Sequence, residues 1–108
     1  MNIYNKLIRD RIDEVIENDG KIAHTRILDE AEYKTELKKK LKEEAEELLD
    51  ASEADVLNEL ADVVEVLEHI MDAYGISAEI LRESQRDKAL SKGKFARRLF
   101  LISVEDKE

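Results

Sequence analysis

Cysteine and proline are both absent from this chain of 108 residues, and glycine occurs only three times. The lack of cysteine excludes a disulfide framework, a thiolate zinc site and a cysteine nucleophile. Aromatic residues make up only 5% of the chain, whereas charged residues make up 42%. With no proline to interrupt helices, this balance favours long helices with charged outer faces over a sheet-rich fold.

Two further features bear on partners and location. No apolar run approaches the length needed to cross a membrane, and four of the first eleven residues are charged, which does not match a signal peptide. We therefore expect a cytoplasmic protein without a membrane partner. The net charge of -9 argues against binding of a nucleic-acid polymer, because its phosphates require a basic surface. A small anionic substrate is compatible with this charge if a cation screens it.

Apolar residues recur at helical spacing in four stretches, residues 5–19, 29–51, 56–75 and 77–91. Asp29 and Glu32 form a capping box that predicts the start of the longest helix. Glycines follow or end the other three stretches, as expected of residues that terminate helices. The length and the apolar content of 43% fit a single domain over residues 1–108. The sequence thus predicts an all-α helical bundle of about four helices.

Two segments have a β-prone composition instead. Residues 21–28 and 99–104 are rich in branched or aromatic side chains between turn signals. We expect these segments to pair as a small β-ribbon beside the helices.

The helical phase of residues 29–51 places some acids among the apolar side chains. Because an α-helix advances about 100° per residue, Glu44 falls inside the apolar arc and Glu47 lies about 60° to one flank. Glu43 and Glu46 turn toward solvent. The next stretch repeats the pattern, since Glu59 lies beside apolar side chains and Asp62 lies on the flank.

A helical hairpin would bring these two pairs of acids together. With a turn centred near Glu53, Glu47 and Glu59 lie six residues away on either arm, and Glu44 and Asp62 lie nine residues away. The four carboxylates then converge, which is costly without a cation, because two like charges 4 Å apart repel by about 4 kcal/mol at an effective dielectric near 20. Oxygen ligands alone favour Mg²⁺, with Mn²⁺ as the alternative. Chance Glu-x-x-Glu pairs are common in so acidic a chain, but two inward-facing pairs at matched height are not.

The residues that carry these acids also match a family signature. The sequences LKEEAEELLDA at 41–51 and NELADVV at 58–64 resemble the Glu-x-x-Glu and Glu-x-x-Asp motifs of MazG-like nucleotide pyrophosphohydrolases. The sequences YNKLIRDRI at 4–12, YGIS at 74–77 and KGKFARRLFL at 92–101 are similar to those of a stand-alone branch, described as phosphoribosyl-ATP pyrophosphohydrolase-like or house-cleaning enzymes. Asp13 and Lys94 depart from that branch, which commonly has Pro and Gly there.

This resemblance implies an activity and a set of site residues. The expected reaction is Mg²⁺-dependent hydrolysis of an ordinary or damaged nucleoside triphosphate between the α and β phosphates, giving a monophosphate and pyrophosphate. Glu44, Glu47, Glu59 and Asp62 would be both the metal ligands and the catalytic residues. The candidates for substrate binding are one aromatic and six basic side chains in segments that the resemblance covers: Lys6, Arg9, Lys88, Lys92, Phe95, Arg97 and Arg98.

Two alternatives stay open at this point. One is true phosphoribosyl-ATP pyrophosphohydrolase of histidine biosynthesis, which keeps the chemistry and changes the substrate. The other is a non-catalytic helical interaction protein with a structural cation site. Whichever function holds, a short hairpin leaves one side of each apolar stripe uncovered, so we expect a homo-oligomer, with a dimer favoured.

Overall fold

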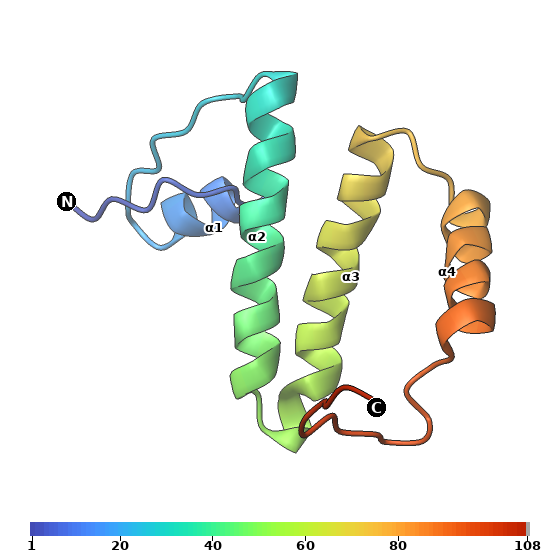
Figure 1. Cartoon of the computed structure of the whole chain (residues 1–108). Helices are drawn as coiled ribbons and strands as arrows, with labels where there is room; N and C mark the ends of the chain where they lie inside the picture. The colour runs from blue at the N-terminus through green and yellow to red at the C-terminus, as the bar shows by residue number, and fades with distance from the viewer. Residues whose placement is uncertain (108) are drawn as a thin grey trace. The chain divides into compact units, whose positions relative to one another are not determined.

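The computed structural model describes residues 1–107 and contains four α-helices (Figure 1). They are α1 (Ile12–Asn18), α2 (Glu30–Asp50), α3 (Val56–Ala73) and α4 (Ala78–Lys92), with a 3-10 turn, η1 (Glu53–Asp55), between α2 and α3. The prediction of an all-α fold with about four helices is confirmed. In the described part of the chain, no helix is both long enough and apolar enough to cross a membrane.

The chain divides into two compact units, which we describe separately. The first unit is Met1–Ile76 and contains α1, α2 and α3; the second begins at Ser77 and contains α4. That residues 1–108 act as one functional domain stays a prediction.

The first unit is organised by a helical hairpin. Helices α2 and α3 lie side by side and antiparallel, joined through η1 (Figure 1). Leu37 on α2 is 3% exposed and Val66 on α3 is 8% exposed, and they are the buried hydrophobic residues of the part of the chain that is described. The turn predicted near Glu53 is therefore confirmed, and the core between the two helices is small.

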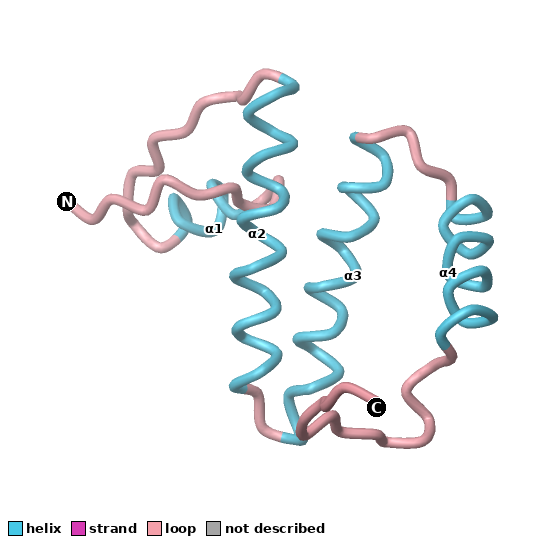
Figure 2. The backbone as a smooth tube through the Cα atoms, viewed as in Figure 1, coloured by secondary structure: helices cyan, strands magenta, loops and turns pink. Residues whose placement is uncertain are grey.

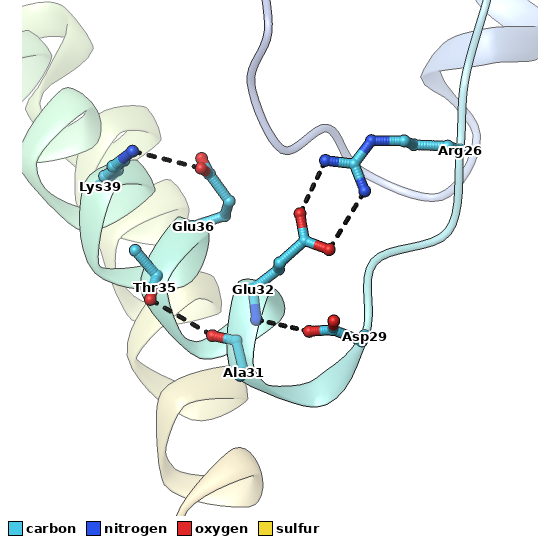
Figure 3. Close-up of polar contacts among 7 residues, drawn as sticks. All are labelled: Arg26, Asp29, Ala31, Glu32, Thr35, Glu36 and Lys39. Atoms are coloured by element: carbon cyan, nitrogen blue, oxygen red, sulfur yellow. Dashed lines mark hydrogen bonds and ion pairs between the residues drawn. The ribbon is translucent and has the colours of Figure 1, made fainter.

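The start of α2 is fixed by polar contacts (Figure 3). Asp29 Oδ1 accepts a hydrogen bond of 2.8 Å from the backbone N–H of Glu32, as the capping box predicts. The Glu32 carboxylate also accepts two hydrogen bonds, of 3.3 and 2.7 Å, from the Arg26 guanidinium. This bidentate pair attaches the preceding loop to the first turn of α2.

Helix α1 is shorter than the stretch 5–19 that the sequence predicts. It begins at Ile12, and Asn5 has a φ of 46°, which is outside the helical region. Residues 1–9 have no regular secondary structure, so the prediction of helix from residue 5 is wrong. The side chain of Lys6 contacts α2 and that of Arg9 contacts α3, as described below.

Two helices of the first unit end with the same glycine motif. Gly75 has a φ of 67°, and its N–H donates to the carbonyl of Asp72 while the Ile76 N–H donates to that of Met71. This is a Schellman ending, which needs a left-handed residue that glycine adopts without strain. Gly20 ends α1 in the same way.

The second unit begins with a capped helix. Ser77 Oγ accepts a hydrogen bond of 3.1 Å from Ile80 N–H, and α4 then continues to Lys92 before Gly93. The predicted helix over residues 77–91 is confirmed within one residue at each end.

The predicted β-ribbon is not formed. Residues 21–28 and 99–104 contain no strand, and none occurs elsewhere in residues 1–107 (Figure 2). The two segments belong to different units. A two-stranded ribbon without a covering layer is marginally stable in water, so β-prone composition alone does not make one.

Candidate metal centre

Four carboxylates from two helices converge in the first unit. Glu44 and Glu47 come from α2, and Glu59 and Asp62 come from α3. Each side chain offers one oxygen, and these oxygens all lie within 4.8 Å of one another. We call these residues the acid quartet. The four acids were predicted to converge from their helical phase and their spacing, and the hairpin does bring them together.

Burial distinguishes the acid quartet from an ordinary solvated cluster. Glu44 is only 7% exposed, and its Oε2 is buried without a hydrogen-bond partner. The Oε2 atom of Glu59 is also buried and has no partner. A buried carboxylate oxygen without a partner is costly, and a cation bound among the four oxygens would remove that cost. The donor set, made only of carboxylate oxygens, fits a hard divalent cation.

The same burial and crowding alter the proton affinities of Glu44 and Glu59. Burial and the repulsion from the neighbouring Glu47 raise the pKa of Glu44 above that of an ordinary glutamate. Burial, with repulsion from Glu47 and Asp62, likewise raises the pKa of Glu59. A proton or a metal ion can relieve the same repulsion, so the two compete for this site.

Basic side chains of the N-terminal segment lie at the border of the acid quartet. Arg9 Nη2 donates a hydrogen bond of 2.7 Å to Asp62 Oδ1. Lys6 Nζ donates one of 3.0 Å to Glu43 Oε1, and this bond is the main reason that the pKa of Lys6 is raised. Of the seven predicted substrate-binding residues, the structure thus brings Lys6 and Arg9 next to the acids.

The structure corrects the expectation that Glu43 faces only solvent. Its side chain is 32% exposed and accepts hydrogen bonds from both Lys6 and Lys40, the latter at 3.3 Å. Although partial burial opposes ionisation, these two cations hold the pKa of Glu43 below its usual value. Glu43 therefore fastens the N-terminal segment to α2.

Lys40 is a residue that the sequence reasoning missed. Its side chain is 16% exposed, and Nζ lies 3.6 Å from Glu44 Oε1 as well as near Glu43. The spacing of three and four residues along one helix was the available signal, since such side chains are neighbours on the helix surface. Lys40 partly neutralises the most buried member of the acid quartet.

A surface hollow of about 660 Å³ adjoins the acid quartet at the turn of the hairpin. Its lining contains six acids and no basic residue: Glu43, Glu46, Glu47, Asp50, Asp55 and Glu59, with Ala51 and Ser52. A phosphate group would be repelled from such a surface. Anionic substrates therefore require a cation here.

The other five candidate residues for substrate binding lie in the second unit. Lys88 and Lys92 belong to α4, and Phe95, Arg97 and Arg98 follow it. Residues 88–98, which we call the basic segment, contain five basic residues and no acid. Phe95 is 97% exposed, so its ring is available for contact with a ligand or another chain.

Comparisons of the chain with protein-family models, with curated proteins and with solved structures found no match. The resemblance to MazG-like pyrophosphohydrolases stays a prediction.

Proposed function

We propose that this chain is a MazG-like nucleotide pyrophosphohydrolase that depends on a divalent cation bound by the acid quartet. The observation that carries the proposal is the buried, unpartnered Oε2 of Glu44 inside a cluster of four converging carboxylates. Such a cluster does not serve the stability of the fold, because removing the buried like charges would stabilise it, and clustered carboxylates of this kind are typical of functional sites. A site that binds a cation gives the cluster a use.

Magnesium is the cation that we propose, with manganese as the substitute. All four ligands are carboxylates, and neither cysteine nor histidine is among them. Magnesium prefers oxygen ligands and commonly bridges protein carboxylates to substrate phosphates.

The substrate that we propose is a nucleoside triphosphate, ordinary or damaged, cleaved between its α and β phosphates. Water attacks phosphorus, the bond from that phosphorus to the bridging oxygen breaks, and the products are a nucleoside monophosphate and pyrophosphate. The bound cation would neutralise the negative charge of the phosphates and make the attacking water more acidic.

The chain's own side chains supply the remaining functions. Glu47 is an exposed member of the acid quartet, so it can reach a water molecule and accept its proton. Lys6 and Arg9 border the site and can pair with phosphate oxygens. For Lys88, Lys92, Arg97 and Arg98 a phosphate-binding role, and for Phe95 a contact with the base, are proposed from the family resemblance alone.

We further propose that the working form is a homodimer. Leu60, Val64 and Leu67 form one stripe of α3 at spacings of four and three residues, and they are 43%, 47% and 40% exposed. With only Leu37 and Val66 as buried hydrophobic residues in the described part of the chain, the core is small for a chain of this length. Association through the apolar stripe would bury it in the same way in both copies.

Product analysis tests the proposed activity. Purified protein with millimolar Mg²⁺ is incubated with a panel of ordinary and damaged nucleoside triphosphates and with phosphoribosyl-ATP. We expect a monophosphate and pyrophosphate, and no product when Mg²⁺ is chelated. Diphosphate with inorganic phosphate would indicate another bond and contradict the proposal, and cleavage of phosphoribosyl-ATP alone would favour the enzyme of histidine biosynthesis. No cleavage of any substrate, with cation binding retained, would favour the non-catalytic cation-binding protein.

A further inference from the structure

Arg9 makes a direct contact with one of the proposed metal ligands. Its Nη2 lies 2.7 Å from Asp62 Oδ1, a contact between residues 53 positions apart in the sequence. Lys6, on the same segment, binds Glu43 instead, which is outside the acid quartet. Arg9 therefore places a positive charge on the cluster before any other cation binds.

The backbone at Arg9 is held, whereas its side chain is half exposed. The Arg9 carbonyl accepts a hydrogen bond of 3.1 Å from Ile12 N–H, which attaches it to the first turn of α1. The side chains of Arg9 and Asp62 are 54% and 31% exposed. An ion pair as exposed as this one is weak, so a divalent cation can displace the guanidinium at small cost. The tethered backbone would keep the released side chain close to the site.

We infer that Arg9 is the resident counter-ion of Asp62, and that it leaves Asp62 for a substrate phosphate when the divalent cation binds. This inference rests on the proposed function. Two cations that share the Asp62 carboxylate repel each other, so the Arg9 bond and cation binding are in competition. The planar guanidinium is suited to bidentate contact with phosphate oxygens, and one side chain would thus couple cation binding to phosphate binding.

The inference predicts effects of opposite sign from one substitution. Arg9→Gln removes the competing charge, so it should bind Mn²⁺ alone about two- to fivefold more tightly than the wild type, the range expected for an exposed ion pair. The same variant, saturated with Mn²⁺, should bind inorganic pyrophosphate at least about fivefold more weakly. Isothermal titration calorimetry measures both affinities.

Arg11→Gln is the matched control. Arg11 lies on the same segment and its loss changes the net charge equally, but its side chain is 87% exposed and it pairs with Glu14 at 3.3 Å. Arg11→Gln should leave both affinities close to those of the wild type. If both variants tightened Mn²⁺ binding equally, the effect would come from the change of net charge and not from the Arg9–Asp62 contact, and the inference would be wrong.

The remaining outcomes separate this inference from the proposed function. Weaker binding of Mn²⁺ by Arg9→Gln would show that Arg9 supports Asp62 as a ligand. That result would overturn the inference that Arg9 leaves Asp62 when the cation binds, but it would not contradict the metal site. No binding of Mn²⁺ or Mg²⁺ by the wild type would overturn the proposed function. If Arg9→Gln does not fold, Arg9→Lys replaces it: the retained charge predicts Mn²⁺ affinity near that of the wild type, with weaker pyrophosphate binding because the bidentate fork is lost. Unchanged pyrophosphate affinity in that variant would overturn the inference.

Discussion

Lys40 Nζ lies 3.6 Å from Glu44 Oε1, while Oε2 of the same carboxylate is buried and has no partner. Lys40 thus partly neutralises Glu44 from its own helix, while the carboxylate of Glu44 lies among the other members of the acid quartet. The arrangement leaves a residual negative charge in the hairpin that only a proton or a cation can relieve. Stability and cation binding should therefore depend on the same carboxylate.

Glu44→Gln should stabilise the protein in the absence of metal and abolish its response to metal. Glutamine has nearly the same shape but removes a buried charge from a cluster of like charges. At neutral pH in chelator we expect a gain of about 1 kcal/mol, which raises Tm by roughly 4–8 °C for a domain of this size. Thermal melting with and without millimolar Mg²⁺ measures both effects.

Glu46→Gln is the control for that substitution. Glu46 is exposed and lies outside the acid quartet, so its variant should keep the wild-type rise of Tm with Mg²⁺. Equal loss of the Mg²⁺ response in the two variants would contradict a site defined by Glu44.

Without metal, the stability of the protein should fall as the pH rises above about 4.5. The pKa values of Glu44 and Glu59 are raised from the ordinary 4.5, so the folded state holds their protons more tightly than the unfolded state does. Their contribution is fully present below the unfolded pKa and is lost as the pH rises through the folded pKa. Glu43, whose pKa is lowered, acts in the opposite direction and below 4.5.

Thermal melting in chelator, between about pH 5 and pH 8, measures how steeply the stability falls as the pH rises. Mg²⁺ should flatten the curve, because the cation replaces the protons that are lost. Glu44→Gln should also flatten it, which separates the local effect from the repulsion of a chain with a net charge of -9. The same slope in Glu44→Gln would mean that the acid quartet is not its source.

Glu43→Gln should loosen the N-terminal segment while leaving the metal ligands in place. It weakens the contacts with Lys6 and Lys40, and such partly exposed pairs contribute about 0.2–1 kcal/mol each. We expect a small loss of stability and faster amide hydrogen exchange around residues 6–12, with Mg²⁺ affinity within about twofold of the wild type. A loss of Mg²⁺ binding as large as that of Glu44→Gln would assign Glu43 to the metal site instead.

The fold of this chain was predictable where local rules agree. The Asp29 cap, the Gly75 ending and the apolar spacing of residues 56–75 each act within a few residues, and all three match the structure. The first helix was predicted too long, because Leu7 and Ile8 also fit a helical period. In the structure, Lys6 and Arg9 instead contact residues far along the chain. Such long-range contacts override weak local preferences.

The candidate site was predictable for a related reason. The helical phase of each acid and its distance from Glu53 depend only on residue spacing. They were sufficient to predict that the four acids of the acid quartet converge. The partners of Arg9 and Glu43 could not be found in that way, because an irregular segment has no fixed period. The acidic hollow at the hairpin turn likewise depends on how α2 and η1 meet.

A charged substitution in the exposed apolar stripe of α3 should separate the proposed dimer. Val64→Glu places a charge at its centre, where Val64 is 47% exposed in the single chain. Light scattering should give twice the chain mass of 12.5 kDa for the wild type and the single mass for the variant. Ile27→Glu, at a side chain that is 98% exposed and outside the stripe, is the control and should remain dimeric. A monomeric wild type would contradict the dimer.

The central claim is that pyrophosphate release depends on a cation held by the acid quartet. The most direct test is the rate of Mg²⁺-dependent pyrophosphate release, on the best nucleotide of the panel, for Asp62→Asn and for Glu68→Asn, an exposed acid on the same helix. We predict a loss of about 100-fold or more for Asp62→Asn, because a metal ligand is removed, and a rate within about twofold of the wild type for Glu68→Asn. Equal rates in the two folded variants would contradict the account.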